Sequence, residues 1–351
     1  MTKFGDVVDC TKEELPYIAD KAKLGSKTSY LQNGDVIIAD TAEDDTVGKA
    51  TEIFNIQTPV VSGLHTMACR PRLNFESRFL GYYINSACYH NQLYPFMQGV
   101  KVTSISKGNI ALTKIRYPAN KEQQKIASMI ALLDDRIKKQ QQLIDSLKLY
   151  KRGAFLELYR KSQKNKYTFS DIYETASEGG TPSTSIAEYY EKGDIPFIKI
   201  DDLSGRYVTT AKNFITQRGL EKSSAWLIPA NSLIFSNGAT IGACSINKIP
   251  IATKQGILGI VPKDNISVSF LYYYMTSSIF MKKIKAITTK GTMDCAYLKD
   301  ISTIHIELPD FNTQIQIAEI LDALSSHVEK QEGILSNLLK SKQALLQQMF
   351  I

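Results

Sequence analysis

The five cysteines of this 351-residue chain, Cys10, Cys69, Cys88, Cys244 and Cys295, form no Cys-x-x-Cys pair. An odd, unpatterned set indicates reduced thiols in a cytoplasmic protein, and it argues against a disulfide framework or a structural zinc site. No apolar run is long enough to span a bilayer, and no basic segment followed by an apolar one opens the chain. The sequence therefore predicts neither a transmembrane helix nor a signal peptide.

Catalytic motifs are also missing. The four histidines, His65, His90, His305 and His327, lie far apart and have no metal-ligand spacing. There is no phosphate-binding GxxxxGK[ST] loop, no GxSxG nucleophile turn and no dinucleotide-binding GxGxxG. Runs such as Asn-Pro-Pro-Tyr, which would indicate an amino-methyltransferase, are absent as well. We therefore expect no catalytic residues, no bound cofactor and no metal site in this chain.

The chain does contain a repeated heptad pattern. Apolar residues alternate in steps of four and three along residues 119–161, as in the a/d seam of a coiled coil, and the pattern recurs 191 residues later. Its two polar interruptions recur too, because Gln140 matches Gln331 and Lys151 matches Lys342. A polar seam residue costs stability and fixes register. We expect the two helices to pack on each other through Ile126, Ile130, Leu133, Ile137, Ile144, Leu147, Ile317, Leu321, Leu324, Val328, Leu335 and Leu338.

The seam divides the chain into four parts. We predict a first globular domain at residues 1–118, a central spacer helix at 119–166, a second globular domain at 167–309 and a C-terminal spacer helix at 310–351. The predicted fold class is α+β with a pseudo-two-fold internal repeat: two similar globular domains separated by two long coiled-coil helices. Helices of this length would act as spacers that hold the two domains at a fixed distance.

The two globular segments repeat the same order of local patterns. Thr46-Val47-Gly48 matches Thr240-Ile241-Gly242, and alternating apolar residues predict a closing strand near Ile110–Ile115 and near Ile301–Ile306. The second segment has about forty additional residues at its front, roughly 167–206. The first globular segment is therefore expected to be short at its N-terminus.

Charge is concentrated on one helix. The net charge of the chain is +7, and residues 119–166 carry twelve Lys and Arg against five Asp and Glu. A basic helix is compatible with phosphate contact, and it is equally compatible with a solvated face.

Polar loops recur at equivalent places in both globular segments. Small, hydroxyl, amide and ammonium side chains can donate hydrogen bonds to phosphates and pair with base edges. A single loop of this kind is ordinary surface chemistry, but recurrence in two domains favours an extended polar ligand such as DNA. The candidate DNA-binding residues are Thr181, Ser183, Lys199, Ser236, Asn237, Lys254, Lys290 and Thr292 in the second domain, with Lys101 and Thr103 in the first.

Several sequence runs together resemble the specificity subunit of type I restriction-modification systems. They are Gly-Gly-Thr-Pro-Ser at 179–183, Tyr-Tyr followed by Gly-Asp-Ile-Pro-Phe within 189–197, Gln-Gln-Lys-Ile-Ala at 123–127, Gln-Ile-Gln-Ile-Ala at 314–318 and Leu-Leu-Gln-Gln-Met-Phe at 345–350. The resemblance covers nearly the whole chain.

The resemblance implies that each globular segment is a target recognition domain that reads one half of a bipartite double-stranded DNA sequence. It also implies that the two long helices pack antiparallel and bind two methyltransferase subunits, which carry S-adenosylmethionine. Restriction subunits can join this complex. The chain itself would catalyse nothing. The short first domain leaves three alternatives open: a truncated or rearranged allele, a misplaced start, or completion by a separate fragment. A protein-binding scaffold and a free-standing DNA-binding regulator are the alternative functions.

Overall fold

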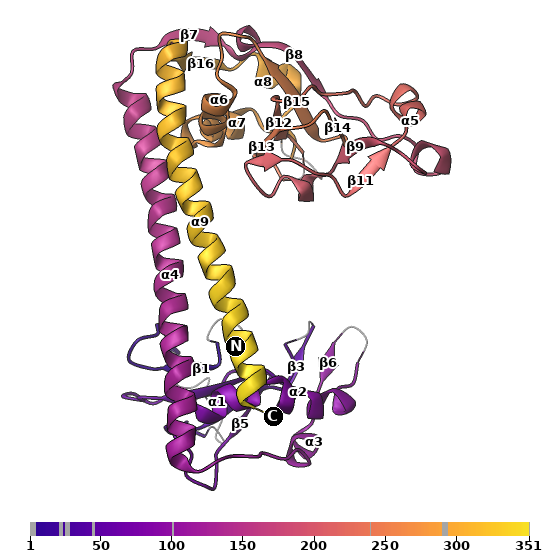
Figure 1. Ribbon diagram of the computed structural model, residues 1–351. Helices are drawn as coiled ribbons and strands as arrows, with labels where there is room; N and C mark the ends of the chain where they lie inside the picture. Colours follow the sequence, from indigo (N-terminus) through magenta and orange to yellow (C-terminus); the bar gives the residue numbers. More distant parts are fainter. Residues whose placement is uncertain are drawn as a thin grey trace. The chain divides into compact units, whose positions relative to one another are not determined.

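The structure is a computed structural model that describes residues 5–20, 24, 29–43, 46–99, 102–238, 240–289 and 294–350. Two helices dominate it, α4 (Asn120–Lys161) and α9 (Phe311–Met349) (Figure 1). None of the helices that it describes combines the length and the apolar character needed to cross a membrane.

The chain forms two compact units, and each takes part of both long helices. Unit 1 comprises Met1–Ile144 and Gln331–Ile351, and unit 2 comprises Asp145–Lys330. Each unit therefore consists of one globular part together with the segments of α4 and α9 that belong to it.

Unit 1 contains a four-stranded sheet in the order β1-β4-β2-β5 and a two-stranded β3-β6 ribbon. Strand β1 is parallel to β4, and β2 is antiparallel to both β4 and β5. The core joins this sheet to the short helices and to the unit's part of α4. The elements are β1 (Val7–Asp9), β2 (Val36–Ala39), β3 (Thr41–Ala42), β4 (Ala50–Phe54), β5 (Thr66–Cys69), α1 (Phe79–Ile84), α2 (Ala87–Leu93), η2 (Tyr94–Phe96), β6 (Thr103–Ser104) and α3 (Lys107–Ala111).

Unit 2 contains a five-stranded sheet in the order β10-β13-β12-β15-β8, a three-stranded β11-β9-β14 sheet and a β16-β7 pair. Its elements up to residue 221 are β7 (Asn165–Thr168), η3 (Phe169–Ile172), β8 (Tyr173–Glu178), η4 (Ala187–Tyr189), β9 (Ile195–Ile198), η5 (Ile200–Asp202), β10 (Tyr207–Val208), β11 (Asn213–Ile215) and α5 (Gln217–Glu221). The remainder are β12 (Leu233–Ser236), β13 (Cys244–Asn247), β14 (Ala252–Thr253), β15 (Ile257–Pro262), α6 (Val268–Thr276), α7 (Ser278–Ile287), α8 (Leu298–Ser302) and β16 (His305–Leu308).

The two sheets repeat one topology. Strand β2 lies between β4 and β5 as β12 lies between β13 and β15. The turn that follows each strand is also the same, because Gly48 and Gly242 have φ of 82° and 105° and donate their N–H groups to Ala39 and Ser236. Positive φ favours glycine, which explains why the Thr-x-Gly run occurs in both copies. The internal repeat predicted from sequence is therefore confirmed in the fold of each unit.

Within each unit, α4 and α9 pack antiparallel (Figure 1). In unit 1, Asp134 contacts Lys342 and Gln140 contacts Gln331. Residue numbers therefore increase along α4 in the direction in which they decrease along α9. The predicted seam residues are buried or half-buried along both helices, with Ile130 and Leu321 fully enclosed. Gln140 Nε2 donates to Gln331 Oε1 at 2.8 Å, so the two polar seam residues that match in sequence also satisfy each other. This pairing supports their predicted role in register.

Both long helices have a buried glutamine in their first turn. Gln123 Nε2 donates to the Pro118 carbonyl at 2.9 Å, and its Oε1 accepts from the Glu76 N–H. Gln314 repeats this with the Pro309 carbonyl, also at 2.9 Å, and the Ser267 N–H. Each amide satisfies two backbone groups where the chain enters the helix, which assigns a structural role to the repeated glutamine motif.

A lysine of the seam connects the helices to the globular part of unit 1. Lys342 Nζ lies 2.6 Å from both Asp6 Oδ2 and Asp134 Oδ1, and all three side chains are mostly buried. Tyr82 donates its hydroxyl to Asp134 at 2.8 Å. Burial together with the Asp134 charge raises the pKa of Tyr82, so the phenol stays protonated and remains a donor.

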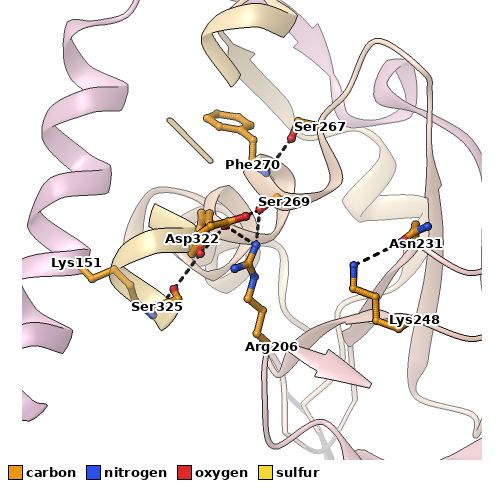
Figure 2. Close-up of polar contacts among 10 residues, drawn as sticks. Lys151, Arg206, Asn231, Lys248, Ser267, Ser269, Phe270, Asp322 and Ser325 are labelled. Carbon is orange, nitrogen blue, oxygen red and sulfur yellow. Dashed lines mark hydrogen bonds and ion pairs between the residues drawn. The ribbon is translucent and has the colours of Figure 1, made fainter. Parts of the chain in front are cut away.

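The equivalent place in unit 2 uses different charges. Arg206 pairs with Asp322 of α9 and donates to Ser269, while Lys151 of α4 donates to Ser325 at 3.2 Å (Figure 2). Arg206 takes the position that Asp6 has in unit 1, because Ile246 N–H donates to the Arg206 carbonyl as Glu52 N–H donates to that of Asp6. The charge is thus reversed at this position between the two copies.

One local prediction was wrong in unit 1 and only partly confirmed in unit 2. The closing strands predicted near Ile110–Ile115 and Ile301–Ile306 begin instead as helices α3 and α8. Ser106 caps α3 by accepting from the Asn109 N–H, and only residues 305–308 of the second segment form a strand, β16. The alternation of apolar residues was too short to distinguish one turn of helix from a strand.

Candidate nucleic-acid interface

Backbone hydrogen bonds bring several of the predicted loops of unit 2 together. The Gly180 N–H donates to the Thr253 carbonyl at 3.0 Å, and the Lys254 N–H donates to the Ile198 carbonyl at 3.0 Å. The Gly179–Ser183 turn, the end of β14 and the end of β9 are therefore adjacent. The residues that come directly after Gly180, Ile198 and Thr253 are Thr181, Lys199 and Lys254. Segments far apart in sequence therefore present their polar groups in one region.

The same region includes the bases of two further loops. Asn237 accepts at its carbonyl from the Ala296 N–H at 2.9 Å, and its own N–H donates to Gly256 at 3.1 Å. Thr289 and Cys295, which follow α7, form a β-bridge with each other. The loops after β12, β14 and α7 are thus held together by backbone hydrogen bonds around Asn237. We call this set of bonds the loop foundation.

Glycine is required where the turn meets β14. A Cβ on Gly179 would collide with the carbonyl oxygens of Thr253 and Lys254, and one on Gly180 would collide with the backbone at Ser224–Ala225. The glycines of the Gly-Gly-Thr-Pro-Ser run therefore allow the turn to pack on neighbouring backbone, which explains their place in the motif.

We expect Gly179→Ala to destabilise unit 2 by about 1–3 kcal/mol, because backbone must move to admit the methyl group. Gly205→Ala is the matched control, since a Cβ there meets nothing within 4 Å and its carbonyl acceptor is kept. Urea unfolding of both variants measures the difference. Equal free energies of unfolding for the two variants would show that the turn accommodates the methyl group without losing stability.

Four of the predicted DNA-binding side chains are exposed in this region or beside it: Thr181, Ser183, Lys199 and Lys254. Ser183 Oγ pairs with Ser185 Oγ at 2.8 Å, and Lys199 Nζ donates to Asn213 Oδ1 at 3.0 Å. Asn213 was not predicted from sequence. Its amide places the Lys199 ammonium at the surface, and it lies fourteen residues from that lysine.

The predictions for Ser236 and Asn237 require correction, because both side chains are fully buried. Asn237 Nδ2 donates to Glu178 Oε1 at 2.8 Å and to the Ala296 carbonyl at 3.1 Å. Neither residue is available to a duplex in this conformation. Their role is to hold the loops in place, and no local pattern signals this role, since Glu178 and Ala296 are each 59 positions from Asn237.

The remaining candidates are placed only in part. Lys101, Lys290 and Thr292 lie outside the described residues. Thr103 lies in β6, half-buried, and pairs with Ala42 of β3. In unit 1 the Gln98–Ser104 bridge and the Ile105 N–H to Asp40 carbonyl bond repeat the Thr289–Cys295 bridge and the Ala296–Asn237 bond of unit 2. The loop foundation is thus common to both copies.

The comparison with known families covers both copies. A family model described as "Type I restriction modification DNA specificity domain" matches residues 8–149 and again residues 161–340. The chain belongs to this family. The two matches correspond to the two copies of the repeat, so the family resemblance seen in the sequence motifs is confirmed.

Curated relatives are also specificity subunits. The chain is 32% identical over 174 residues to the type I restriction enzyme MjaIX specificity subunit of Methanocaldococcus jannaschii, covering 48% of this chain and 40% of the relative. It is 31% identical over 150 residues to the EcoR124I/EcoR124II specificity subunit of Escherichia coli, covering 41% and 37%. The matches thus span about two fifths of the length of these relatives. These proteins are named as specificity subunits and not as the catalytic components of their systems.

Solved structures share the fold over most of the chain. One, from work on complex assembly and conformational transition of the type I R-M system, has a TM-score of 0.61 at 18% identity and covers 93% of this chain and 84% of that chain. A type I restriction-modification S subunit from M. genitalium has a TM-score of 0.53 at 16% identity, again covering 93% and 84%. The predicted α+β architecture with an internal repeat agrees with these structures.

Proposed function

We propose that this specificity-family protein reads a bipartite double-stranded DNA target, with one half-site read by each unit, and that it does no chemistry itself. The observation that carries the proposal is the convergence of the Gly179–Ser183 turn, Lys199 and Lys254 on a foundation that recurs in unit 1. Ammonium and hydroxyl groups on adjacent loops suit phosphate and base-edge contacts. The backbone hydrogen bonds at the foot of these loops would hold the polar groups at fixed positions along the duplex.

We also propose that the helix pair binds methyltransferase subunits of a type I complex. These partners would supply S-adenosylmethionine and the methylation chemistry, and restriction subunits would join the same assembly. Support comes from the family and from the exposed apolar side chains on α4, which include Met129, Leu132, Leu149 and Tyr150. A helix that exposes apolar residues outside its seam is suited to a further protein contact.

Methylome sequencing of the host with and without this gene tests the proposal. The expected result is a split methylated motif that disappears on deletion. An unchanged methylome, together with no binding of the purified complex to any genomic duplex, would contradict it and favour a protein-binding scaffold.

Lys254→Ala measures the contribution of the interface once the motif is known. We expect affinity for the cognate duplex to fall about tenfold, and the slope of log K against log salt to fall by about one, because one phosphate contact is lost. Lys263→Ala is the control, since Lys263 is exposed just beyond the opposite end of β15. Equal effects of the two substitutions would remove Lys254 from the interface.

A further inference from the structure

The outer edge of β5 in unit 1 differs from its counterpart in unit 2. Strand β5 pairs with β2 through Val36–Cys69 and Ile38–Met67, as β15 pairs with β12 through Leu233–Ile260 and Phe235–Leu258. Strand β15 also pairs on its other side with β8. Among the described residues of unit 1, no strand takes the position of β8, so β5 is the edge of its sheet.

The burial of the two strands follows this difference. The first four residues of β15 are fully buried, whereas those of β5 are half-buried, with Ala68 exposed. An edge strand offers unpaired N–H and C=O groups to any extended segment that can reach it. Addition of a strand at such an edge is a common way for one protein to bind a segment of another.

In unit 1 a side chain replaces the first of the residue pairs that β16 makes with β7 in unit 2. Gln92 accepts from the Lys114 N–H at 2.9 Å and donates to the Lys114 carbonyl at 3.1 Å. Lys114 corresponds to His305, which pairs with Thr168 of β7 in unit 2. The backbone at Lys114 is therefore satisfied without a further strand.

The residue beside the open β8 position defines the chemistry of an incoming strand. In unit 2, Asn237 donates to Glu178, the last residue of β8. Asp40 has the position of Asn237 in unit 1, because its N–H donates to His65 and its carbonyl accepts from Ile105, as those of Asn237 do with Gly256 and Ala296. A carboxylate accepts hydrogen bonds and repels another carboxylate. A strand beside β5 must therefore carry a donor where β8 carries Glu178.

We propose that the β5 edge of unit 1 binds an extended segment of a separate polypeptide, antiparallel to β5, with Lys or Arg facing Asp40. The backbone of Thr66–Cys69 gives the pairing, and Asp40 gives the selectivity. Two positions before this Lys or Arg, the partner strand carries a small or apolar residue. That position corresponds to Ala176, which packs against the core in unit 2.

Two labelled peptides test the proposal with the full-length chain. One has the sequence of residues 165–180, and the other has the same sequence with Glu178→Lys. Fluorescence anisotropy should show the Lys peptide binding at least tenfold more tightly. Hydrogen exchange should show new protection at Thr66–Cys69 and none at β15, which is already paired on both sides.

Asp40→Asn supplies the reciprocal test, since it recreates the Asn237 environment and should reverse the preference in favour of the Glu178 peptide. Equal binding of both peptides, or no binding of either, would overturn the proposal, and this comparison requires only the unaltered chain. Protection of β5 before any peptide is added would also overturn it, because a second copy or another segment of the same chain would already occupy the edge.

Discussion

Aspartate in place of Ile130 is expected to lower the free energy of unfolding of unit 1 by about 4 kcal/mol or more. Ile130 is fully buried in the cluster that joins α4 to the sheet and the short helices. The substitution removes the apolar side chain from that cluster and introduces a carboxylate without a partner. The two losses add, so the effect should be among the largest that one residue can produce in this unit.

Leu132→Asp is the matched control, because Leu132 is two positions away on the same helix and is 71% exposed. We expect its effect to stay within about 0.5 kcal/mol. Urea unfolding measures both variants, and hydrogen exchange at β2 and α1 assigns the loss to unit 1. If both substitutions shifted unfolding equally, the seam would not carry the stability of this unit.

Lys342→Met is expected to destabilise unit 1 by about 3 kcal/mol, because it leaves Asp6 and Asp134 without their shared cation. Methionine keeps most of the side-chain volume, so the loss reports charge and not packing. Adding Asp6→Asn and Asp134→Asn to the Lys342→Met chain should restore much of the stability. Lys125→Met is the control, since its ion pair with Glu122 is solvent-exposed, and its expected effect is within about 0.5 kcal/mol. A triple variant no more stable than Lys342→Met would contradict the electrostatic explanation.

The same residue gives a pH dependence. Burial lowers the pKa of Lys342, but the charges of Asp6 and Asp134 outweigh it, so the pKa is raised above its ordinary 10.5. The folded state therefore holds this proton more tightly than the unfolded state does. The stabilisation is complete below 10.5 and is lost as pH rises through the higher folded pKa. The stability gap between the unaltered chain and Lys342→Met should stay constant from neutral pH to about pH 9 and narrow above the ordinary lysine pKa.

The long helices could be predicted because their signal is local and repeated. The seam covers both helices, and the match of Gln140 with Gln331 in the repeat indicates the pairing that their side chains make. Short elements were less predictable. One capped turn such as α3 has too few residues for its periodicity to exclude a strand.

The candidate interface could be predicted only in outline. The exposed candidates Thr181, Lys199 and Lys254 were identifiable as polar residues in loops, and the separation of the two globular parts by the helices stays a prediction. The burial of Asn237 was not accessible, because it depends on Glu178 and Ala296, two distant segments that meet only in the fold. The close packing of Gly179 and Gly180 on neighbouring backbone was likewise not predicted, because the segments that they contact are distant in sequence.

The reversed charges at positions 6 and 206 limit how the two copies can exchange sequence. Asp322 of α9 forms an ion pair with Arg206, whereas Lys342 of α9 forms one with Asp6. Recombination between the repeats could exchange a helix segment without the strand that carries its charge partner. Such an exchange would place like charges next to each other or leave a charged side chain without its counterion. Exchange of sequence between the two copies is therefore expected to transfer strand β1 or β10, with the charged residue before it, together with the helix segment that this residue contacts.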